Sequence, residues 1–599
     1  MCFSLLKDWC DALTGLQLTQ ITDPSLYGGI LCPACGRIHG RCGDAIYPML
    51  FMAARTGETK YLDCAKRLFL WSENMVNPDG SYRNDTNSDW NGITVFAVTQ
   101  LAAALHGYSR LLDAETCTLW TRRLRIGADY LLENAEKIGG NVNYPVTAAY
   151  AMAAAGHALN DGRYIRKAHA LAQNALHYIT PEGLLYGEGK PWERITPKGC
   201  RPMDLGYNVE ESLPALLAYA ELEQDEAVRA AAEKALLAHL AFMLPDGAWD
   251  NSWGTRNNKW SYWGSRTSDG CLLGYGLLAE KYPACGEAVR RNTQLLRACT
   301  QNGLLCGGPM YADAGERPCV HHTICHAKAL ASLLEHGIEP AKSAVPLPRE
   351  TQAAVVTFPM VHVSLLSKGP WRATVSDYDF EYSSEGHATG GAVTMLWHES
   401  LGPVFAGTMT KYVLVEPNNM QLPQYLGEIC LTPRLEYAEN GAYYRSINDL
   451  SAIVSCTEAP GAICVHASGR LCDAAQAGER TYSLRYTLTD SAFEIAGQAA
   501  HPGAVLHLPV ISGQADRVRI PDACTVILER EKGRITLRAD RPLRIRDDFP
   551  QKAPLTEKKP AAAPEYHRVF NPVGGFEALP VCLDAGSEPF SVAVTVENA

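Results

Sequence analysis

Apolar residues recur along residues 40–337 with the spacing of α-helices, and the helical segments come in pairs. Segments of one set are rich in Ala, Leu and Gly and apolar almost all round; they begin near Gly40, Trp90, Tyr144, Tyr207, Arg266 and Val320. Each is followed by a more charged, amphipathic segment, such as 61–76, 164–179 or 226–244. Because helices that are apolar all round are buried and amphipathic ones cover them, the pattern predicts six inner helices inside six outer ones.

The spacing of these segments indicates a repeat architecture. Their starts lie 50 to 63 residues apart, which suits two helices with their loops. A Pro/Gly-rich turn recurs after the charged segments, at Pro78–Tyr82, Pro181–Leu185, Pro245–Trp249 and Asn302–Leu305. Six repeats without an evident capping unit favour a closed (α/α)6 toroid; an open superhelix is the competing prediction.

Beyond a Pro-rich break at Gly337–Pro348 the hydrophobic period changes from helical to two. β-branched alternation at 355–364, 373–376, 482–488 and 590–596 is typical of strands, and Gly, Pro and Asp mark the turns between them. We therefore expect a multi-domain chain, α then β: a toroid over 1–337, a linker over 338–352 and an antiparallel β-sandwich over 353–599.

Composition narrows the classes of partner. The 599 residues are 47% apolar and 20% charged, as in globular proteins, and the net charge is −11. This acidic balance argues against nucleic acid and anionic membranes as partners. We find no apolar stretch long enough to span a bilayer and no signal-peptide core, so we expect a cytoplasmic protein. The 20 scattered cysteines suit a reducing compartment, and a homodimer through the sandwich stays open.

A closed toroid would gather the amino ends of its inner helices at one mouth, where partial positive charge suits an anion. Tryptophans offer flat faces to sugars, Asn fixes hydroxyl groups, and Arg can grip a carboxylate in bidentate fashion. Capping would explain one polar residue per helix, and Arg256 and Arg266 could instead neutralise Asp250 and Asp269. The candidate substrate-binding residues are Arg41, Asn91, Asn143, Tyr144, Tyr207, Asn208, Trp253, Arg256, Trp260, Arg266, His321, His322 and His387.

Glycoside hydrolysis usually needs two carboxyl groups, an acid and a base or nucleophile. On a regular helix Glu211 would share the pore with Asn208, three residues before it, while Glu210 would point toward neighbouring helices. Asp89 and Asp269, close to the starts of the second and fifth inner helices, are the expected partners of Glu211. The alternative for each is a helix cap.

We expect no cofactor. The one candidate metal site is Cys32-Pro-Ala-Cys35 followed by His39 and Cys42, whose three thiols and imidazole could hold zinc. The spacing is tighter than in common zinc knuckles, and His39 could serve the mouth instead.

The stretches His39–Pro48, Tyr207–Ser212 and Cys319–Lys328 resemble the bacterial β-glucuronidases of glycoside hydrolase family 154. Over almost the whole chain the expected architecture also resembles the heparinase II/III-like polysaccharide lyases. The closer resemblance implies exo-acting removal of terminal β-D-glucuronic acid, but it does not assign the catalytic residues.

The expected function is therefore an exo-β-glucuronidase that acts on an acidic carbohydrate through Glu211 with Asp89 or Asp269. A uronate-specific lyase is the first alternative: a neutralised carboxylate acidifies C5–H, and Tyr207, His322 or His387 takes the proton. A sugar-binding protein without catalysis is the second. Whether a hydrolase would retain or invert the anomeric configuration is left open.

Overall fold

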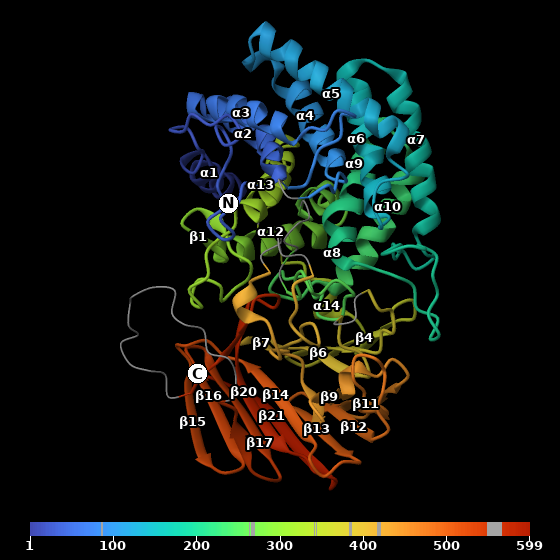
Figure 1. The fold of residues 1–599 in the computed structure, drawn as a ribbon. Helices are drawn as coiled ribbons and strands as arrows, with labels where there is room; N and C mark the ends of the chain where they lie inside the picture. Colours follow the sequence, from blue (N-terminus) through green and yellow to red (C-terminus); the bar gives the residue numbers. More distant parts are fainter. Residues whose placement is uncertain are drawn as a thin grey trace.

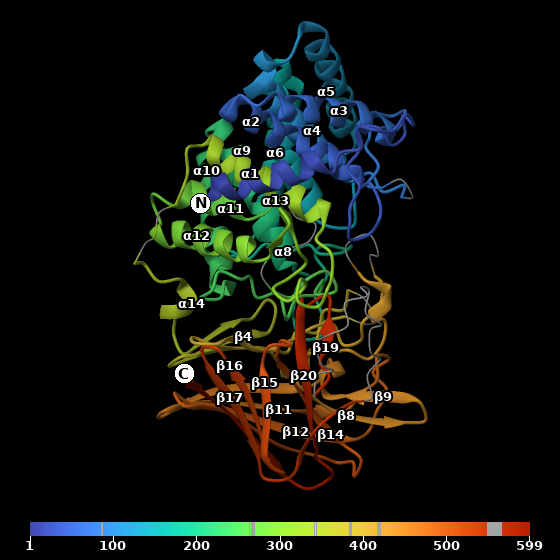
Figure 2. The ribbon, with the colours of Figure 1, turned by 90° about the vertical axis from the view of Figure 1, so that its left-hand side faces the viewer.

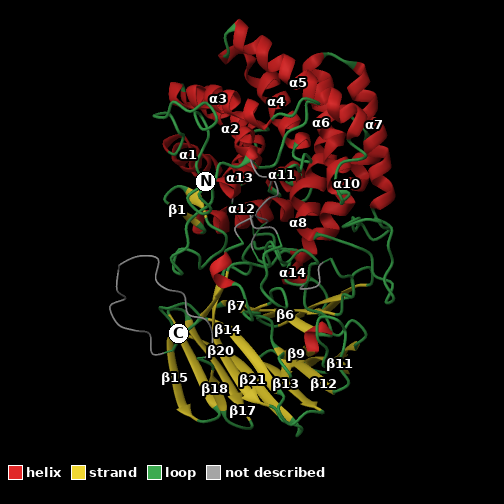
Figure 3. Cartoon of the chain, in the orientation of Figure 1, coloured by secondary structure: helices red, strands yellow, loops and turns green. Residues whose placement is uncertain are grey.

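The computed structural model describes residues 1–85, 88–262, 264, 270–340, 342, 344–382, 386–415, 421–547 and 566–599. Helices fill the N-terminal part of the chain and strands the C-terminal part, and the two parts are stacked on each other (Figures 1 and 3). The last inner helix ends at Glu335, and the first strand of the C-terminal part begins at Val355. In the described residues no helix is both long and apolar enough to span a membrane.

The inner helices form a closed ring. They are α2 (Ile46–Thr56), α4 (Thr94–Tyr108), α6 (Asn143–Leu159), α9 (Leu213–Glu223), α11 (Leu272–Leu278) and α13 (Val320–Glu335). Each contacts the next, and α13 contacts α2. The predicted toroid is thereby confirmed, and the open superhelix is wrong.

Each inner helix packs on an outer one. The outer helices are α3 (Thr59–Ser72), α5 (Ala114–Asn134), α7 (Gly162–Ala175), α10 (Glu226–His239), α12 (Pro283–Ala298) and α1 (Cys2–Gly15). The partner of α13 is α1, from the other end of the domain, so the ring closes by bringing the chain's first helix onto its last inner one (Figure 2). We had expected every charged helix to follow its inner partner, and this last pair differs.

Local sequence signals explain where the outer helices begin and end. Asp113, Asp161 and Asp225 cap α5, α7 and α10, each accepting a hydrogen bond from a backbone N–H of the first turn. The recurrent turn is a tight hairpin whose Gly80, Gly183 and Gly247 have φ of 90°, 96° and 89°. These left-handed values favour glycine, which explains why the motif recurs after successive helices.

The described residues of the C-terminal part form three antiparallel sheets. The first comprises β3 (Val355–Phe358), β4 (Val363–Lys368), β5 (Trp371–Ser376), β6 (Ala392–His398) and β7 (Gly402–Ala406). The second comprises β18 (Leu543–Ile545), β20 (Phe576–Asp584), β14 (Val505–Ile511), β8 (Arg434–Glu439) and β9 (Ala442–Arg445), with β19 (Val569–Asn571) beside β20. The third comprises β10 (Ile453–Ala459), β11 (Ala462–Arg470), β12 (Thr481–Leu488), β13 (Ala492–Ala499), β21 (Phe590–Asn598), β17 (Gly533–Ala539), β16 (Thr525–Arg530) and β15 (Arg517–Asp522). This arrangement confirms the predicted sandwich class.

The first sheet joins the sandwich to the toroid. On β6, Met395 and Trp397 pack in the core shared with the helices, whereas Leu396 between them packs in the core of the sandwich. Because successive side chains of a strand point to opposite faces, β6 is buried on both sides. A short helix, α14 (Pro348–Thr351), precedes this sheet at the boundary between the two parts (Figure 1). The loops before the inner helices α9 and α11 also contact this region: Lys198 N–H donates to Asp379, and Asp250 pairs with Arg349.

Candidate active site

The fourth inner helix starts irregularly, and this start carries the centre of the candidate site. It consists of α8 (Leu205–Tyr207), a π-helical turn (Asn208–Ser212) and then α9. Asp204 caps it by accepting a hydrogen bond from the Tyr207 N–H at 3.0 Å. π-helical turns are rare and occur often at functional sites.

Tyr207 lies beneath two cations. The Lys259 ammonium group donates a hydrogen bond to the phenol oxygen, and its nitrogen lies 4.7 Å from the ring centroid. The Arg256 guanidinium lies 4.9 Å from the same centroid. Both side chains are buried, so solvent screens their charges little. Positive charge beside a phenol oxygen stabilises the phenolate, which is a competent base.

Arg256 is fixed by both parts of the protein. Its Nε lies 3.0 Å from Glu188 Oε1, and its Nη2 donates to the Tyr382 hydroxyl at 3.0 Å. Tyr382 lies in the connection between β5 and β6 of the first sheet, so the β-rich part completes the surroundings of Arg256. Asp250, which we considered as a partner of Arg256, is instead paired with Arg349 at 3.2 Å.

A polar pair from the third and fourth inner helices adjoins Tyr207. Asn143 Nδ2 donates to Glu211 Oε2 at 2.8 Å, and both side chains are buried. Next to Asn143, burial raises the pKa of Tyr144, and Tyr207 and Glu211 nearby raise it further. Tyr144 therefore stays protonated and can donate a hydrogen bond, whereas the Tyr207 hydroxyl contacts the Lys259 ammonium group.

A second group of cations surrounds the start of the first inner helix. Asp44 accepts from Arg41 at 2.9 Å and from Lys328 at 3.0 Å, so one carboxylate is shared by two cations. Arg41 also lies 4.1 Å from the Phe96 ring centroid. Phe96 in turn lies 6.3 Å from Tyr144, so aromatic rings connect this group to the surroundings of Tyr207.

His321 and His322 lie buried in the first turn of α13. Burial lowers the pKa of His321 well below its usual value, and the nearby His39 and Arg41 act in the same direction. His321 is thus neutral, and its ring centroid lies 5.1 Å from that of His39. A pocket lies inside the ring of inner helices, and its lining includes Gln100, Glu211 and Lys328.

Comparisons with known proteins decide the family. The N-terminal domain of ulvan lyases matches residues 6–350, and the C-terminal domain of ulvan lyases matches residues 355–598. A broad-specificity ulvan lyase of Formosa agariphila is 37% identical over 598 residues, covering 97% of this chain and 91% of the relative. The chain belongs to the ulvan lyase family.

Solved structures are similar to this chain at low sequence identity, and the one with a TM-score above 0.5 shows the same fold. The chondroitin AC lyase of Streptomyces coelicolor A3 aligns with a TM-score of 0.52 and 13% identity, covering 99% of this chain and 79% of the other. A heparan sulfate lyase of Pedobacter heparinus aligns with a TM-score of 0.47 and 10% identity, covering 92% of this chain and 75% of the other.

Membership of the ulvan lyase family corrects the expected chemistry. The family is one of polysaccharide lyases, so the alternative, a lyase, is supported and the main expectation is wrong. The terms hydrolase, glycosidase and β-glucuronidase do not apply, and the resemblance to family 154 was misleading. The broader resemblance to toroid-plus-sandwich polysaccharide lyases is confirmed. A pair of catalytic carboxyl groups is then no longer required.

Two of the expected carboxyl groups, those of Asp89 and Glu211, have different surroundings. Asp89 is exposed on the loop before α4, whereas Glu211 is buried beside Asn143. Asp269 and Arg266 lie outside the described residues. Glu210, which we expected to point away from the pore, lines the same pocket as Glu211 and lies 3.8 Å from His326.

Two asparagines point away from the mouth. Asn208 Nδ2 donates to the Leu185 carbonyl at 2.7 Å and to His239 at 3.0 Å. Asn91 Nδ2 donates to the Tyr130 hydroxyl of α5 at 2.8 Å. For Asn208 the reason is the π-helical turn, because the expected shared face with Glu211 assumed a regular α-helix.

Trp253 and Trp260 are core residues rather than platforms for sugar rings. Trp253 is completely buried and packs on Phe242 and Tyr378, with centroid distances of 5.1 Å and 5.9 Å. Trp260 fills the space that a Cβ on Gly206 would need. The loop carries tryptophans because it must pack between the helices and the first sheet.

His387 and the thiol cluster also differ from expectation. His387 Nε2 donates to the Tyr378 carbonyl at 2.8 Å, and burial lowers the pKa of His387 to about 4. It supports Tyr378 at the contact between the two parts of the protein. Cys42 lies away from the expected metal ligands, with its sulfur 3.7 Å from the Ile30 carbonyl.

Sequence reasoning left Glu188, Tyr382 and Trp90 out of the site. Trp90 is 37% exposed and lies edge-on to Tyr144 at 5.3 Å, which makes it the better candidate for stacking on a sugar. Its position directly before Asn91 was a usable signal. Glu188 and Tyr382 carried none, because their importance arises only from their contacts with Arg256.

Proposed function

We propose that this protein cleaves an ulvan-type acidic polysaccharide at a uronate residue by β-elimination, with Tyr207 as the base. The observation that carries the proposal is the buried phenol of Tyr207, which Lys259 contacts and Arg256 overlies. The name of the relative from Formosa agariphila supports the substrate class.

The proposed reaction follows from uronate chemistry. Hydrogen bonds or cations on the carboxylate make the neighbouring C5–H more acidic, because they stabilise the negative charge that develops when the proton leaves. Tyr207 takes that proton, the electron pair forms the C4–C5 double bond, and the C4–O bond breaks. The leaving oxygen takes up a proton, and the new chain end is an unsaturated uronate.

Separate groups suit the separate tasks. Arg256 and Asn143, beside Tyr207, are placed to hold the uronate carboxylate. Arg41 and Lys328, which share Asp44, add positive charge for a polyanionic chain. Trp90, exposed beside Tyr144, offers a face for a neighbouring sugar ring.

The decisive experiment incubates the protein with ulvan and follows the ultraviolet absorbance of the conjugated double bond together with product masses. We expect absorbing products that have gained no water. Tyr207→Phe should lower the rate by roughly a hundred-fold to ten-thousand-fold, the usual contribution of acid–base catalysis. Tyr164→Phe is the matched control, because this buried tyrosine of α7 bonds Asp129 on an outer helix.

Products that have gained water and lack the double bond would contradict the elimination. An unchanged rate in Tyr207→Phe would contradict the role of Tyr207 alone. Binding of ulvan without any product would favour the non-catalytic alternative.

A further inference from the structure

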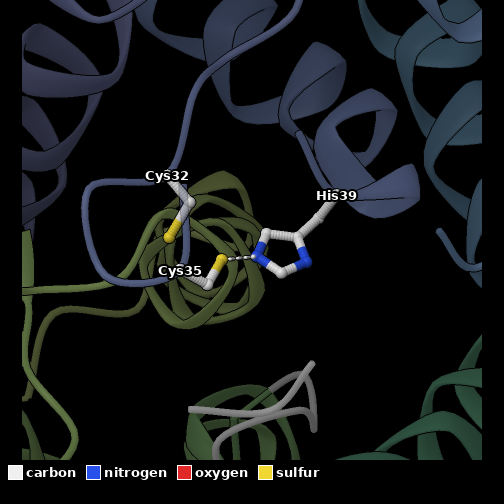
Figure 4. A group of neighbouring side chains, drawn as sticks. All are labelled: Cys32, Cys35 and His39. Carbon is white, nitrogen blue, oxygen red and sulfur yellow. Dashed lines mark hydrogen bonds between the residues drawn. The ribbon is translucent and has the colours of Figure 1, made fainter. Parts of the chain in front are cut away.

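Three potential metal ligands meet on the N-terminal loop that precedes the first inner helix. The sulfur atoms of Cys32 and Cys35 and a ring nitrogen of His39 all lie within 4.8 Å of one another. Figure 4 shows the Cys35 sulfur directed at the His39 ring, with Cys32 beside it. Cys32 and His39 are almost completely buried.

A fourth sulfur lies beside Cys32 and comes from the last repeat of the toroid. Cys319, the residue before α13, places its sulfur 3.7 Å from that of Cys32, although the two are 287 residues apart in sequence. Tetrahedral zinc with Zn–S bonds of about 2.3 Å holds its sulfurs about 3.8 Å apart. A disulfide would need about 2.05 Å, and both cysteines are free thiols.

The orientation of His39 suits a metal ligand. Its Nε2 lies 3.1 Å from the Cys35 sulfur, so this nitrogen faces the thiols. Its Nδ1 lies 3.1 Å from Asp85 Oδ1, on the other side of the ring. Histidines that bind metals commonly place their second nitrogen on a carboxylate in this way, which fixes the tautomer and the ring.

The chemistry of the cluster favours a soft divalent cation. Thiolate sulfurs are soft donors that select zinc over hard cations such as Mg²⁺ and Ca²⁺. Three sulfurs and one imidazole form a closed donor set typical of structural zinc, without a position for a catalytic water.

We propose that Cys32, Cys35, His39 and Cys319 bind one structural Zn²⁺ that fastens the first loop of the toroid to its last inner helix. The metal would fix the loop that continues to Arg41 and the turn of α13 that carries His321 and His322. It would thereby fix the positions of these two segments relative to each other at the mouth of the toroid. The site does not depend on the reaction proposed above.

The test begins with the full-length protein purified without added metal. We expect close to one zinc per chain by elemental analysis. X-ray absorption should show sulfur neighbours at about 2.3 Å and a nitrogen at about 2.0 Å in a ratio of three to one. Neither measurement requires a variant to fold.

Variants then assign the ligands. Cys319→Ser and Cys35→Ser should lose zinc and melt at a lower temperature. Cys42→Ser is the matched control, since Cys42 is buried three residues after His39 but bonds Ile30, and it should keep its zinc. Asp85→Asn should keep the four ligands but bind zinc about 10–100-fold more weakly.

Absence of zinc, a shell of oxygen and nitrogen only, or zinc kept in Cys319→Ser would each overturn the proposal. A disulfide between Cys32 and Cys319 found by mass spectrometry without reduction would overturn it in favour of a redox role.

Discussion

Two buried cations contact the phenol of Tyr207 at the centre of the candidate site. Lys259 contacts the Tyr207 hydroxyl directly, whereas Arg256 lies over the ring and is partly neutralised by Glu188. Because Lys259 contacts the phenol oxygen itself, its charge stabilises the phenolate directly. Their separate effects can be measured by removing the ammonium group alone.

We predict that Lys259→Met lowers kcat/KM on ulvan by about 100-fold, the usual effect of removing one donor from a preorganised site. The acid limb of the pH–rate profile should move to higher pH, because the phenolate loses its counter-charge. Steady-state kinetics across the pH range are the measurement. Lys281→Met, which removes an exposed lysine paired with Glu233, is the control. A loss of activity without any movement of the profile would indicate a structural role.

At the scale of elements, the π-helical turn depends on one outer helix. Asn208 in this turn donates to His239 Nε2 at 3.0 Å, and His239 Nδ1 donates to the Ala235 carbonyl at 2.8 Å. Burial lowers the pKa of His239 to about 4, although the bond to Ala235 acts in the opposite direction. Protonation of Nε2 would break the bond from Asn208 and release the turn that carries Glu210 and Glu211.

We predict an acid sensitivity that originates at His239. Between its unfolded pKa of about 6.5 and its folded pKa of about 4, only the unfolded chain binds the proton, so stability falls as pH falls through this range. By about pH 5 the loss should reach about 2 kcal/mol. Melting temperatures at about pH 7 and about pH 5 should therefore differ less in His239→Gln than in the wild type. His177→Gln, on the exposed end of the neighbouring repeat, is the control, and an equally steep fall in His239→Gln would refute the prediction.

At the scale of the whole molecule, a buried ion pair joins the toroid to the first sheet. Asp250 lies in the loop that carries Arg256 and Lys259, and Arg349 lies in α14; the pair is 3.2 Å apart with both side chains completely buried. Thr374 of β5 also donates to Asp250, and Arg349 donates to the Ala373 carbonyl at 2.9 Å. The β-rich part thus fixes the position of the loop that carries Arg256 and Lys259.

We predict that Arg349→Met costs about 3–5 kcal/mol, because it leaves the Asp250 carboxylate buried without its cation. Asp250→Leu with Arg349→Met should recover part of this loss, since no charge remains unpaired. Thermal unfolding is the measurement. The control Arg297→Met removes an exposed partner of Asp8 and should cost about 0–1 kcal/mol. A single variant as stable as this control would show that the interface does not depend on the pair.

Much of the architecture could be predicted because it depends on local patterns. Helical periodicity and the recurrent glycine turn act over a few residues, and they were sufficient to predict the toroid. Tyr207, Arg256 and Asn143 could be proposed because polar residues at the start of an apolar helix are conspicuous. The family was misjudged because short similar stretches are compatible with hydrolysis and with elimination. The spacing of helices does not distinguish between these two reactions.

The sequence by itself determined the two kinds of layer, the ring of helix pairs and the neighbourhood of the site, because hydrophobic burial is recorded in the period of apolar residues. Only the tertiary structure decided which groups meet. It turned Asn208 outward through a π-helical turn, buried Trp253 against Phe242 and Tyr378 and Trp260 against Gly206, and placed Cys319 rather than Cys42 beside Cys32. The physical reason is that side-chain contacts across the closed ring join residues hundreds of positions apart, and no local pattern encodes such a distance.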